Sequence, residues 1–199
     1  MKNHTNLFTG AERGFLASNL KNKIKGTNIN YGDILENKNI QYKIDNIFHF
    51  AGPSDDFDFA NEEKTIKTII NGTINLLNLA KKKNAKFIFA STKGADKPNN
   101  VYCYSKLLME EYIKNNYDNY IILRIPRVYD KKRNKGLMKK LKLNLVAEKD
   151  MGKKIEYTTL KNFIDQTLLV VNQRNIVYNY NNLEYNSIHY INENFIDRR

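Results

Sequence analysis

A tyrosine and a lysine four residues apart, Tyr102 and Lys106, are the side chains of this sequence best suited to acid–base chemistry. The apolar residues from Leu107 onward predict a helix here, and positions four apart share a helix face. An ammonium group near a phenol stabilises the phenolate and lowers the tyrosine pKa, which gives a proton donor and acceptor usable near neutral pH. The hydroxyls of Ser91 and Thr92, just upstream, are candidates to reach the same substrate oxygen.

A short strand must position these groups. Residues 87–90, Phe-Ile-Phe-Ala, have the length and aromatic content of a buried strand, and a polar turn with Gly94 and Pro98 follows. The Tyr-x-x-x-Lys spacing alone carries little weight, because a chain with 13 Tyr and 33 Lys and Arg produces it by chance. A solvated helix face is the alternative, so the rest of the chain must decide.

The composition sets limits on the kind of protein. A length of 199 residues and a hydrophobic content of 41% fit one domain, or one domain with a small appendage. No apolar run approaches a membrane span, and the first ten residues lack the apolar core of a signal peptide. The one cysteine, Cys103, excludes an internal disulfide and a cysteine-based metal cluster. These features predict a cytoplasmic protein without a metal.

The formal net charge of +12 raises nucleic-acid binding as an alternative. The lysines are scattered, however, and the densest basic stretch, residues 131–142, has no interleaved aromatic residues for base stacking. An anionic small molecule would profit from the same field. We therefore expect a small-molecule ligand rather than a nucleic acid.

The first turn of the chain has the layout of a dinucleotide-binding site. Residues 6–8 are apolar, Gly10 and Gly14 follow, and a helix is expected from Phe15. Glycines let the backbone approach a pyrophosphate, which then lies at the positive helix N-terminus. Ala17 stands where a third glycine is usual, and an ordinary strand–turn–helix is the alternative.

Two further strand ends fit the same interpretation. Asp33 lies about twenty residues beyond the glycine turn, where a ligand of the cofactor ribose is expected. Residues 44–50 read as a strand that ends at Ala51 and Gly52, small residues that allow a cofactor to cross the sheet edge. His49, inside this strand, is expected to be a structural histidine rather than a base.

The order of elements predicts a parallel α/β sheet of Rossmann-like, doubly wound type. A helix is expected over residues 64–82 and a strand over residues 120–125. Beyond Asp130 the pattern loosens into a basic loop or helix, a helix near 163–171, a strand near 175–180 and a last helix near 188–196. We divide the chain into a dinucleotide-binding domain, residues 1–130, and a small, reduced substrate-binding region packed on it, residues 131–199.

With these segments in order, the chain resembles the extended short-chain dehydrogenase/reductases, in particular the NAD-dependent sugar-nucleotide epimerase/dehydratase family. The matching segments are FTGAERGFLASNL, YGDI, IDNIFHFAGPSD, KTIINGTINLLNLAKKKNAKFIFAST, YCYSKLLMEEYI and LRIPRVYD. Two of them look most like UDP-glucuronate decarboxylases.

The resemblance implies a role for each matched position. Tyr102 would be the catalytic base, Lys106 would hold the nicotinamide ribose, and Thr92 would bind the sugar hydroxyl. The cofactor, NAD with NADP not excluded, would be bound by Gly10, Gly14, Phe15, Asp33, Ala51, Gly52 and Lys106. Ser91 and Arg127 would contact the nucleotide-sugar substrate, and a homodimer is compatible with the family.

The sequence also departs from the family pattern. The glycine turn is one residue longer, and Arg127 replaces an asparagine that contacts substrate. The loop at residues 93–96 lacks the acid pair of dehydratases and the glutamate of decarboxylases. We therefore expect an epimerase or ketoreductase that acts by hydride transfer. A decarboxylase-like enzyme and a catalytically idle NAD(P)-binding module are the alternatives.

Overall fold

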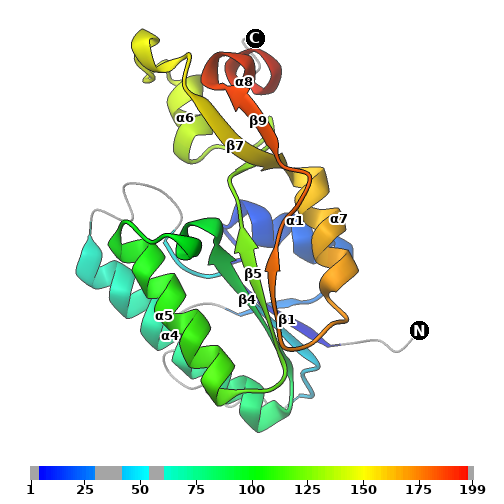
Figure 1. Ribbon diagram of the computed structural model, residues 1–199. Coiled ribbons are helices and arrows are strands. Elements are labelled where there is room, and N and C mark those ends of the chain that lie inside the picture. The colour runs from blue at the N-terminus through cyan, green and yellow to red at the C-terminus, as the bar shows by residue number, and fades with distance from the viewer. Residues whose placement is uncertain (1–4, 30–41, 54–60, 197–199) are drawn as a thin grey trace.

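The apolar runs of the sequence pair side by side in one parallel sheet. The computed structural model describes residues 5–29, 42–53 and 61–196. Within these ranges six strands form the sheet in the order β2-β1-β3-β4-β5-β8, and every neighbouring pair is parallel. The strands are β1 (Asn6–Thr9), β2 (Thr27–Ile29), β3 (Asn46–His49), β4 (Lys86–Thr92), β5 (Tyr120–Ile125) and β8 (Ile176–Asn179). The predicted α/β, Rossmann-like fold is thus confirmed (Figure 1).

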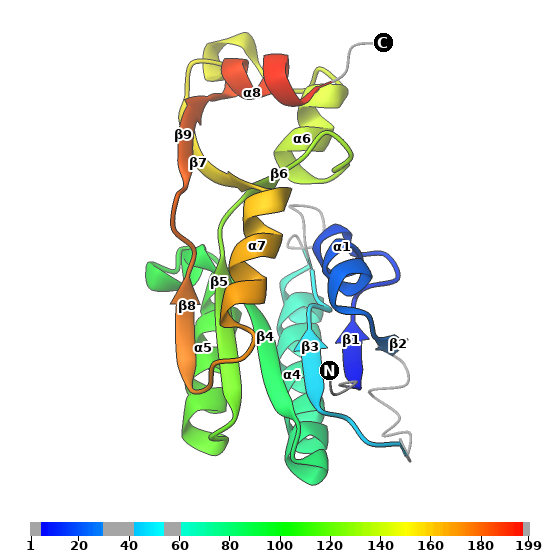
Figure 2. The same cartoon turned by 90° about the vertical axis from the view of Figure 1, so that its right-hand side faces the viewer.

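Helices cover both faces of this sheet (Figure 2). Helices α4 (Glu62–Lys83) and α5 (Val101–Asn116) lie on one face, and α1 (Phe15–Ile24) and α7 (Leu160–Val170) lie on the other. Strand residues alternate between the two cores, because successive side chains of a strand point to opposite faces. Phe87 and Phe89 pack toward α4 and α5, whereas Ile88 packs with the core beneath α1 and α7.

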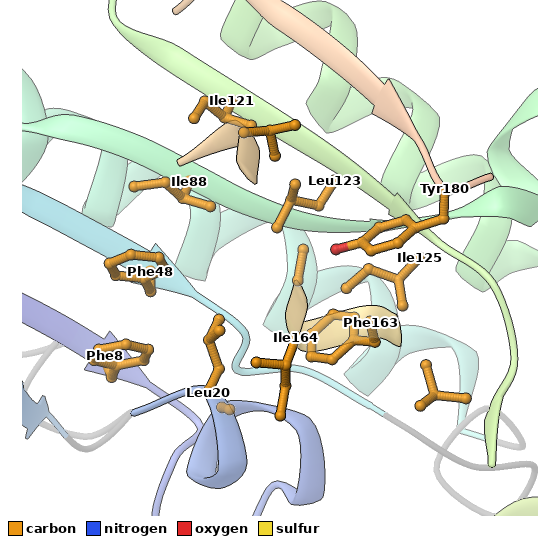
Figure 3. Packing of buried hydrophobic residues seen from close by; sticks show 14 of the residues in the cluster. Phe8, Leu20, Phe48, Ile88, Ile121, Leu123, Ile125, Phe163, Ile164 and Tyr180 are labelled. Atoms are coloured by element: carbon orange, nitrogen blue, oxygen red, sulfur yellow. The ribbon is translucent and has the colours of Figure 1, made fainter. Parts of the chain in front are cut away.

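The core under α1 and α7 joins the start of the chain to its C-terminal half. Phe8 of β1 and Phe48 of β3 stack with ring centroids 4.4 Å apart. Figure 3 shows these rings in line with Ile88, while Leu20 of α1 and Phe163 of α7 close the cluster from the helix side. This packing fixes α1 and its preceding turn relative to the strand ends.

A second, smaller sheet lies beyond the carboxyl ends of the large one (Figure 2). It has the order β6-β7-β9, with β6 (Val128–Tyr129) parallel to β7 (Lys154–Thr159) and β9 (Glu184–Ser187) antiparallel to β7. Helices α6 (Gly136–Lys142) and α8 (Ile188–Phe195) pack on it, and two 3₁₀ turns, η1 (Lys93–Asp96) and η2 (Glu148–Asp150), complete the described elements. The sequence analysis predicted none of these three strands.

The C-terminal part of the chain contributes to both sheets. After β7 the chain returns to the large sheet through α7 and β8, and it then runs back to the small sheet as β9. The division at residue 130 stays a prediction, but the segment after it supplies the sixth strand of the large sheet. None of the helices in the described ranges is long and apolar enough to cross a membrane.

Candidate active site

The turns after β1 and β3 meet at the carboxyl edge of the sheet. From β1 the chain moves to β2 on one side, whereas from the neighbouring β3 it moves to β4 on the other side, the arrangement at which open parallel sheets bind ligands. Gly10 has a φ of +77°, and a Cβ there would lie 2.9 Å from the amide nitrogen of Ala51. The structure therefore brings together Gly10 and Ala51, two predicted cofactor contacts, and Gly52 follows in the same turn.

The glycine turn itself is closed by a backbone hydrogen bond. The Gly14 amide donates to the Gly10 carbonyl oxygen at 2.8 Å, and a Cβ on Gly14 would lie 2.3 Å from that oxygen. Helix α1 begins at Phe15 and has no acidic residue in its first turn, so its positive end is not neutralised by its own side chains. These features fit the pyrophosphate of a dinucleotide, and four residues lie between Gly10 and Phe15.

His49 is held between two threonines in the core. Thr9 Oγ1 accepts hydrogen bonds from the amides of Phe50 and Ala51 at 3.2 and 3.1 Å, which leaves its hydroxyl hydrogen for His49 Nδ1 at 2.9 Å. His49 Nε2 bonds Thr73 Oγ1 at 3.1 Å. Burial, and secondarily the charge of Lys106, lowers the pKa of His49 to about 3. The prediction of a structural histidine is confirmed.

Helix α5 places Tyr102 and Lys106 on the face that meets β4. The Asn100 side chain caps the helix by accepting a hydrogen bond from the Cys103 amide at 2.9 Å, which starts the helix just before Tyr102. Lys106 Nζ lies 5.8 Å from the centroid of the Tyr102 ring and donates to the carbonyl oxygen of Ala90 at 2.7 Å. The structure thus brings together the predicted pair.

Burial dominates the titration of both groups. It lowers the pKa of Lys106 to about 7, partly opposed by the carboxylate of Glu110. It also raises the pKa of Tyr102, reinforced by Cys103 and opposed by the positive charge of Arg133. The expectation that Tyr102 has a lowered pKa is therefore wrong for the protein alone, because desolvation of the phenolate outweighs the favourable charges.

The two hydroxyls at the end of β4 have different surroundings. Ser91 is buried and donates to the carboxylate of Glu110. Thr92 is half-buried, and its Oγ1 accepts from the Gly94 amide at 3.2 Å, which leaves its hydroxyl hydrogen for a further acceptor. Of the two, Thr92 is therefore better placed for a substrate oxygen.

A buried ion-pair network supports this strand end. Glu110 is fully buried, and its carboxylate accepts hydrogen bonds from Arg124 Nε at 2.9 Å and from Nη2 at 2.7 Å. Arg124 Nη1 also contacts Asp96. The network links α5, β5, the end of β4 and the loop after it. The sequence analysis missed Glu110, although its spacing of four from Lys106 places it on the same helix face.

Two further predicted contacts are Asp33, which lies outside the described residues, and Arg127, for which the described residues show no contact with this cluster. Arg127 is exposed between β5 and β6, and its carbonyl oxygen accepts from the Thr158 amide at 2.8 Å. Among the described residues, no group of three or more His, Cys, Asp or Glu side chains could hold a metal ion.

The sequence analysis did not select Arg133, which lies near the start of α1, or Tyr129, which lies near Arg133. Arg133 Cζ lies 5.9 Å from the ring centroid of Phe15, and its charge acts on Tyr102 and Tyr129. Within the described residues, Arg133 Nη1 and Tyr129 Oη are buried without a hydrogen-bond partner. Unsatisfied polar atoms beside a glycine turn fit a polar ligand such as a dinucleotide.

Comparison with known proteins identifies the family. The sequence model described as "NAD dependent epimerase/dehydratase family" matches residues 2–163. The chain belongs to this family. The predicted resemblance is confirmed, and the family consists of enzymes.

Individual relatives are more distant or match only in part. A 54-residue segment is 43% identical to UDP-glucuronic acid decarboxylase 1 of Arabidopsis thaliana, over 27% of this chain and 12% of that protein. The chain thus spans only a small part of that relative. Among solved structures, the UDP-glucose 4-epimerase of Thermotoga maritima with UDP-glucose is 20% identical, with a TM-score of 0.79, over 95% of this chain and 80% of that one.

Two further structures share the fold at similar distance. The UDP-glucose 4-epimerase of Thermus thermophilus in complex with NAD is 15% identical, with a TM-score of 0.78, over 95% of this chain and 81% of that one. RMD of Pseudomonas aeruginosa, complexed with NADPH, has a TM-score of 0.74 at 16% identity, over 95% of this chain and 82% of that one. Structures of this fold therefore include both NAD and NADPH complexes.

Proposed function

We propose that this protein is an NAD(P)-dependent enzyme that acts on a nucleotide sugar, as an epimerase or a ketoreductase. The observation that carries the proposal is the position of Tyr102 and Lys106 beside the end of β4, two strands from the glycine turn of β1. Thr92 ends the same strand. Three groups suited to one carbinol or carbonyl oxygen thus lie at the sheet edge where the family binds its cofactor.

Each side chain has a definite task in this proposal. Tyr102 takes the proton of a sugar hydroxyl, or returns it to a carbonyl oxygen, through its Oη. Thr92 donates a hydrogen bond to the same oxygen and orients it. Lys106 supplies positive charge beside the phenol. A nicotinamide ring, when bound, supplies the hydride acceptor or donor.

The charge balance of the site explains how Tyr102 can act despite its raised pKa. Its phenolate is destabilised by burial, so each positive group that enters the site lowers the pKa. A full charge on Lys106, whose pKa lies near 7, has this effect. We infer that Tyr102 becomes a competent base in the complex with cofactor and substrate rather than in the protein alone.

The loop after β4 favours epimerase or ketoreductase chemistry over dehydration. Asp96 is the only acidic residue between Thr92 and Tyr102, and it is held by Arg124. This ion pair engages the Asp96 carboxylate with Arg124 rather than leaving it free for a substrate hydroxyl. A dehydratase would need a free acid in this loop.

Two alternatives have their own support. The 43% identity to a UDP-glucuronic acid decarboxylase favours a decarboxylase-like enzyme, although it covers 27% of this chain. A cofactor-binding module without turnover is favoured by the departures from the family pattern at Arg127 and in the loop at residues 93–96. For an active enzyme, we propose that residues 131–199 provide the substrate contacts, together with Arg127. We also propose that Asp33 selects NAD over NADP by repelling a 2′-phosphate.

A panel of nucleotide sugars, incubated with NAD or NADPH and analysed for products by mass spectrometry, tests the proposal. We expect one substrate to be epimerised or reduced. Tyr102→Phe should then lower turnover by about a hundredfold or more, the range of general-base loss. Tyr104→Phe is the matched control, because Tyr104 lies on the same helix but is 59% exposed. Pentose formation from a UDP-hexuronic acid would select the decarboxylase, and cofactor binding without any product would select the idle module.

A further inference from the structure

Arg133 reaches from the second sheet to the start of α1. It follows β6 in a turn in which its amide donates to the carbonyl oxygen of Asp130 at 3.0 Å. Its guanidinium carbon lies 5.9 Å from the ring centroid of Phe15, the first residue of α1. A cation from the C-terminal half of the chain is therefore held next to the glycine turn.

The polar atoms at this point are not satisfied by the protein. Arg133 Nη1 and the hydroxyl oxygen of Tyr129 are both buried, with no hydrogen-bond partner in the described ranges. Tyr129 is only 4% exposed. Its ring cannot easily turn the hydroxyl toward water, because it stacks on Tyr157 with centroids 4.9 Å apart and meets the edge of Phe195.

Such an arrangement is costly unless something binds there. A buried polar group without a partner loses its hydrogen bonds to water and gains nothing in return. An arginine remains charged in proteins and presents a planar fork of donors that matches phosphate oxygens. The phenol of Tyr129 adds a neutral donor beside this cation. Both groups suit one anionic ligand with several oxygens.

We propose that Arg133 and Tyr129 bind the pyrophosphate diester of the dinucleotide cofactor beside the first turn of α1. The inference rests on the proposed function, since it assumes that this site holds a cofactor. Phe15 decides between the two available pyrophosphates, that of the cofactor and that of a nucleotide sugar. The contact with Phe15 places Arg133 at the first turn of α1, which carries no acid and whose amides favour phosphate.

Binding measurements on purified protein test this assignment without any turnover. NAD and ADP-ribose are titrated calorimetrically into the parent, Arg133→Gln and Lys132→Gln. ADP-ribose keeps the pyrophosphate but lacks nicotinamide. Lys132→Gln is the matched control, because it removes the same charge from the neighbouring, exposed position. We expect Arg133→Gln to lower the affinity for both ligands by roughly ten- to a hundredfold, which corresponds to the loss of a charge-assisted hydrogen bond. Lys132→Gln should lower both affinities by less than about threefold.

Two conservative variants keep the proposal falsifiable if Arg133→Gln does not fold. Arg133→Lys keeps the charge but loses the fork, so we expect an intermediate loss of affinity. Tyr129→Phe removes only a hydroxyl that has no partner in the described structure, so ligand affinity should fall several-fold while the melting temperature without ligand stays equal or rises.

Each contrary result has a distinct meaning. Equal losses of affinity in Arg133→Gln and Lys132→Gln would show that Arg133 acts only through its long-range charge, and would overturn the proposal. A loss for NAD but not for ADP-ribose would place Arg133 at the nicotinamide half. Unchanged cofactor affinity with weaker binding of UDP-glucose would assign Arg133 to the other pyrophosphate. If the parent binds NAD through Arg133 but converts no nucleotide sugar, the proposed function fails and this inference stands.

Discussion

Lys106 Nζ donates a hydrogen bond to the carbonyl oxygen of Ala90 at 2.7 Å and lies 4.5 Å from the ring centroid of Phe89. The lysine of the candidate catalytic pair is thus fixed to the end of β4, the strand that carries Thr92. It is only 4% exposed, and burial holds its pKa near 7. This contact couples the geometry of the site to a group that titrates close to neutrality.

Lys106 should make stability rise with pH above neutrality. Its folded-state pKa of about 7 lies below the ordinary 10.5, so the unfolded chain holds the extra proton between these values. The free energy of unfolding therefore increases with pH across this window, by at most about 1.4 kcal/mol per pH unit. Urea unfolding at pH 7, 8 and 9 should show this rise in the parent but not in Lys106→Met.

The exposed Lys97 provides the control for this measurement. Lys97→Met should follow the pH dependence of the parent, because an exposed side chain changes its surroundings little on unfolding. If Lys106→Met and the parent rise in parallel, Lys106 carries its full charge in the folded protein and the proposed site electrostatics are wrong.

Glu110 should be among the most sensitive positions for stability. It is fully buried, accepts a hydrogen bond from Ser91 and is paired with Arg124. Glu110→Gln therefore removes the buried one of the two carboxylates that hold this guanidinium and leaves it the more exposed Asp96. Breaking a buried pair on one side costs about 3–5 kcal/mol. The next residue, Glu111, is exposed and pairs with Lys114, so Glu111→Gln should cost less than about 1 kcal/mol. Chemical denaturation of both variants measures the difference, and equal costs would show that the network adds nothing.

The parallel sheet was predictable because its strands are buried on both faces. Residues such as Phe87, Ile88 and Phe89 form continuous apolar runs, and helices of clear periodicity separate them. The second sheet gave no such signal. Strand β7 mixes charged and apolar side chains, β6 has only two residues, and both are defined by pairing between distant segments.

The candidate site was predictable where spacing along one element defines it. Tyr102 and Lys106 share a helix face, and Gly10 and Gly14 share a turn. The sequence could not show that Arg133 lies against Phe15, because 118 positions of chain separate them and the contact depends on how β6 leaves the sheet. Nor could it show that Ser91 bonds Glu110 while Thr92 accepts from the Gly94 amide, since those contacts depend on how β4, the loop after it and α5 pack together.

The glycine turn should tolerate no side chain at Gly14. A Cβ there would lie 2.3 Å from the Gly10 carbonyl oxygen, which is backbone and cannot rotate away. Gly14→Ala should therefore open the turn, lower the affinity for NAD at least tenfold and lower the melting temperature. Gly152→Ala is the control, because a Cβ there meets nothing within 4 Å.

Calorimetric titration with NAD and thermal unfolding together check this prediction. Retained affinity and stability in Gly14→Ala would mean that the turn is looser than the structure has it. A fall in stability alone, with NAD affinity unchanged, would separate the turn from the cofactor site.

His49 should govern part of the acid sensitivity of the fold. Its pKa is lowered to about 3, below the ordinary 6.5, so between these values the unfolded chain binds a proton that the folded protein excludes. Stability from this group is complete above pH 6.5 and is lost as the pH falls toward 3, at up to about 1.4 kcal/mol per unit. The parent should thus lose stability in acid faster than His49→Gln, which has no group to titrate there.

The comparison works as a difference between two curves, because the carboxylates that titrate in the same range are common to both proteins and cancel. His49→Gln should itself be less stable than the parent at pH 7, since an amide replaces the bonds to Thr9 and Thr73 imperfectly. The difference in free energy of unfolding between His49→Gln and the parent should become steadily smaller from pH 6.5 to pH 4. His189 is 62% exposed, so the difference in free energy of unfolding between His189→Gln and the parent should stay constant over the same pH range. A constant difference for His49→Gln as well would mean that His49 accepts a proton inside the fold, and the neutral bridge between the two threonines would then be wrong.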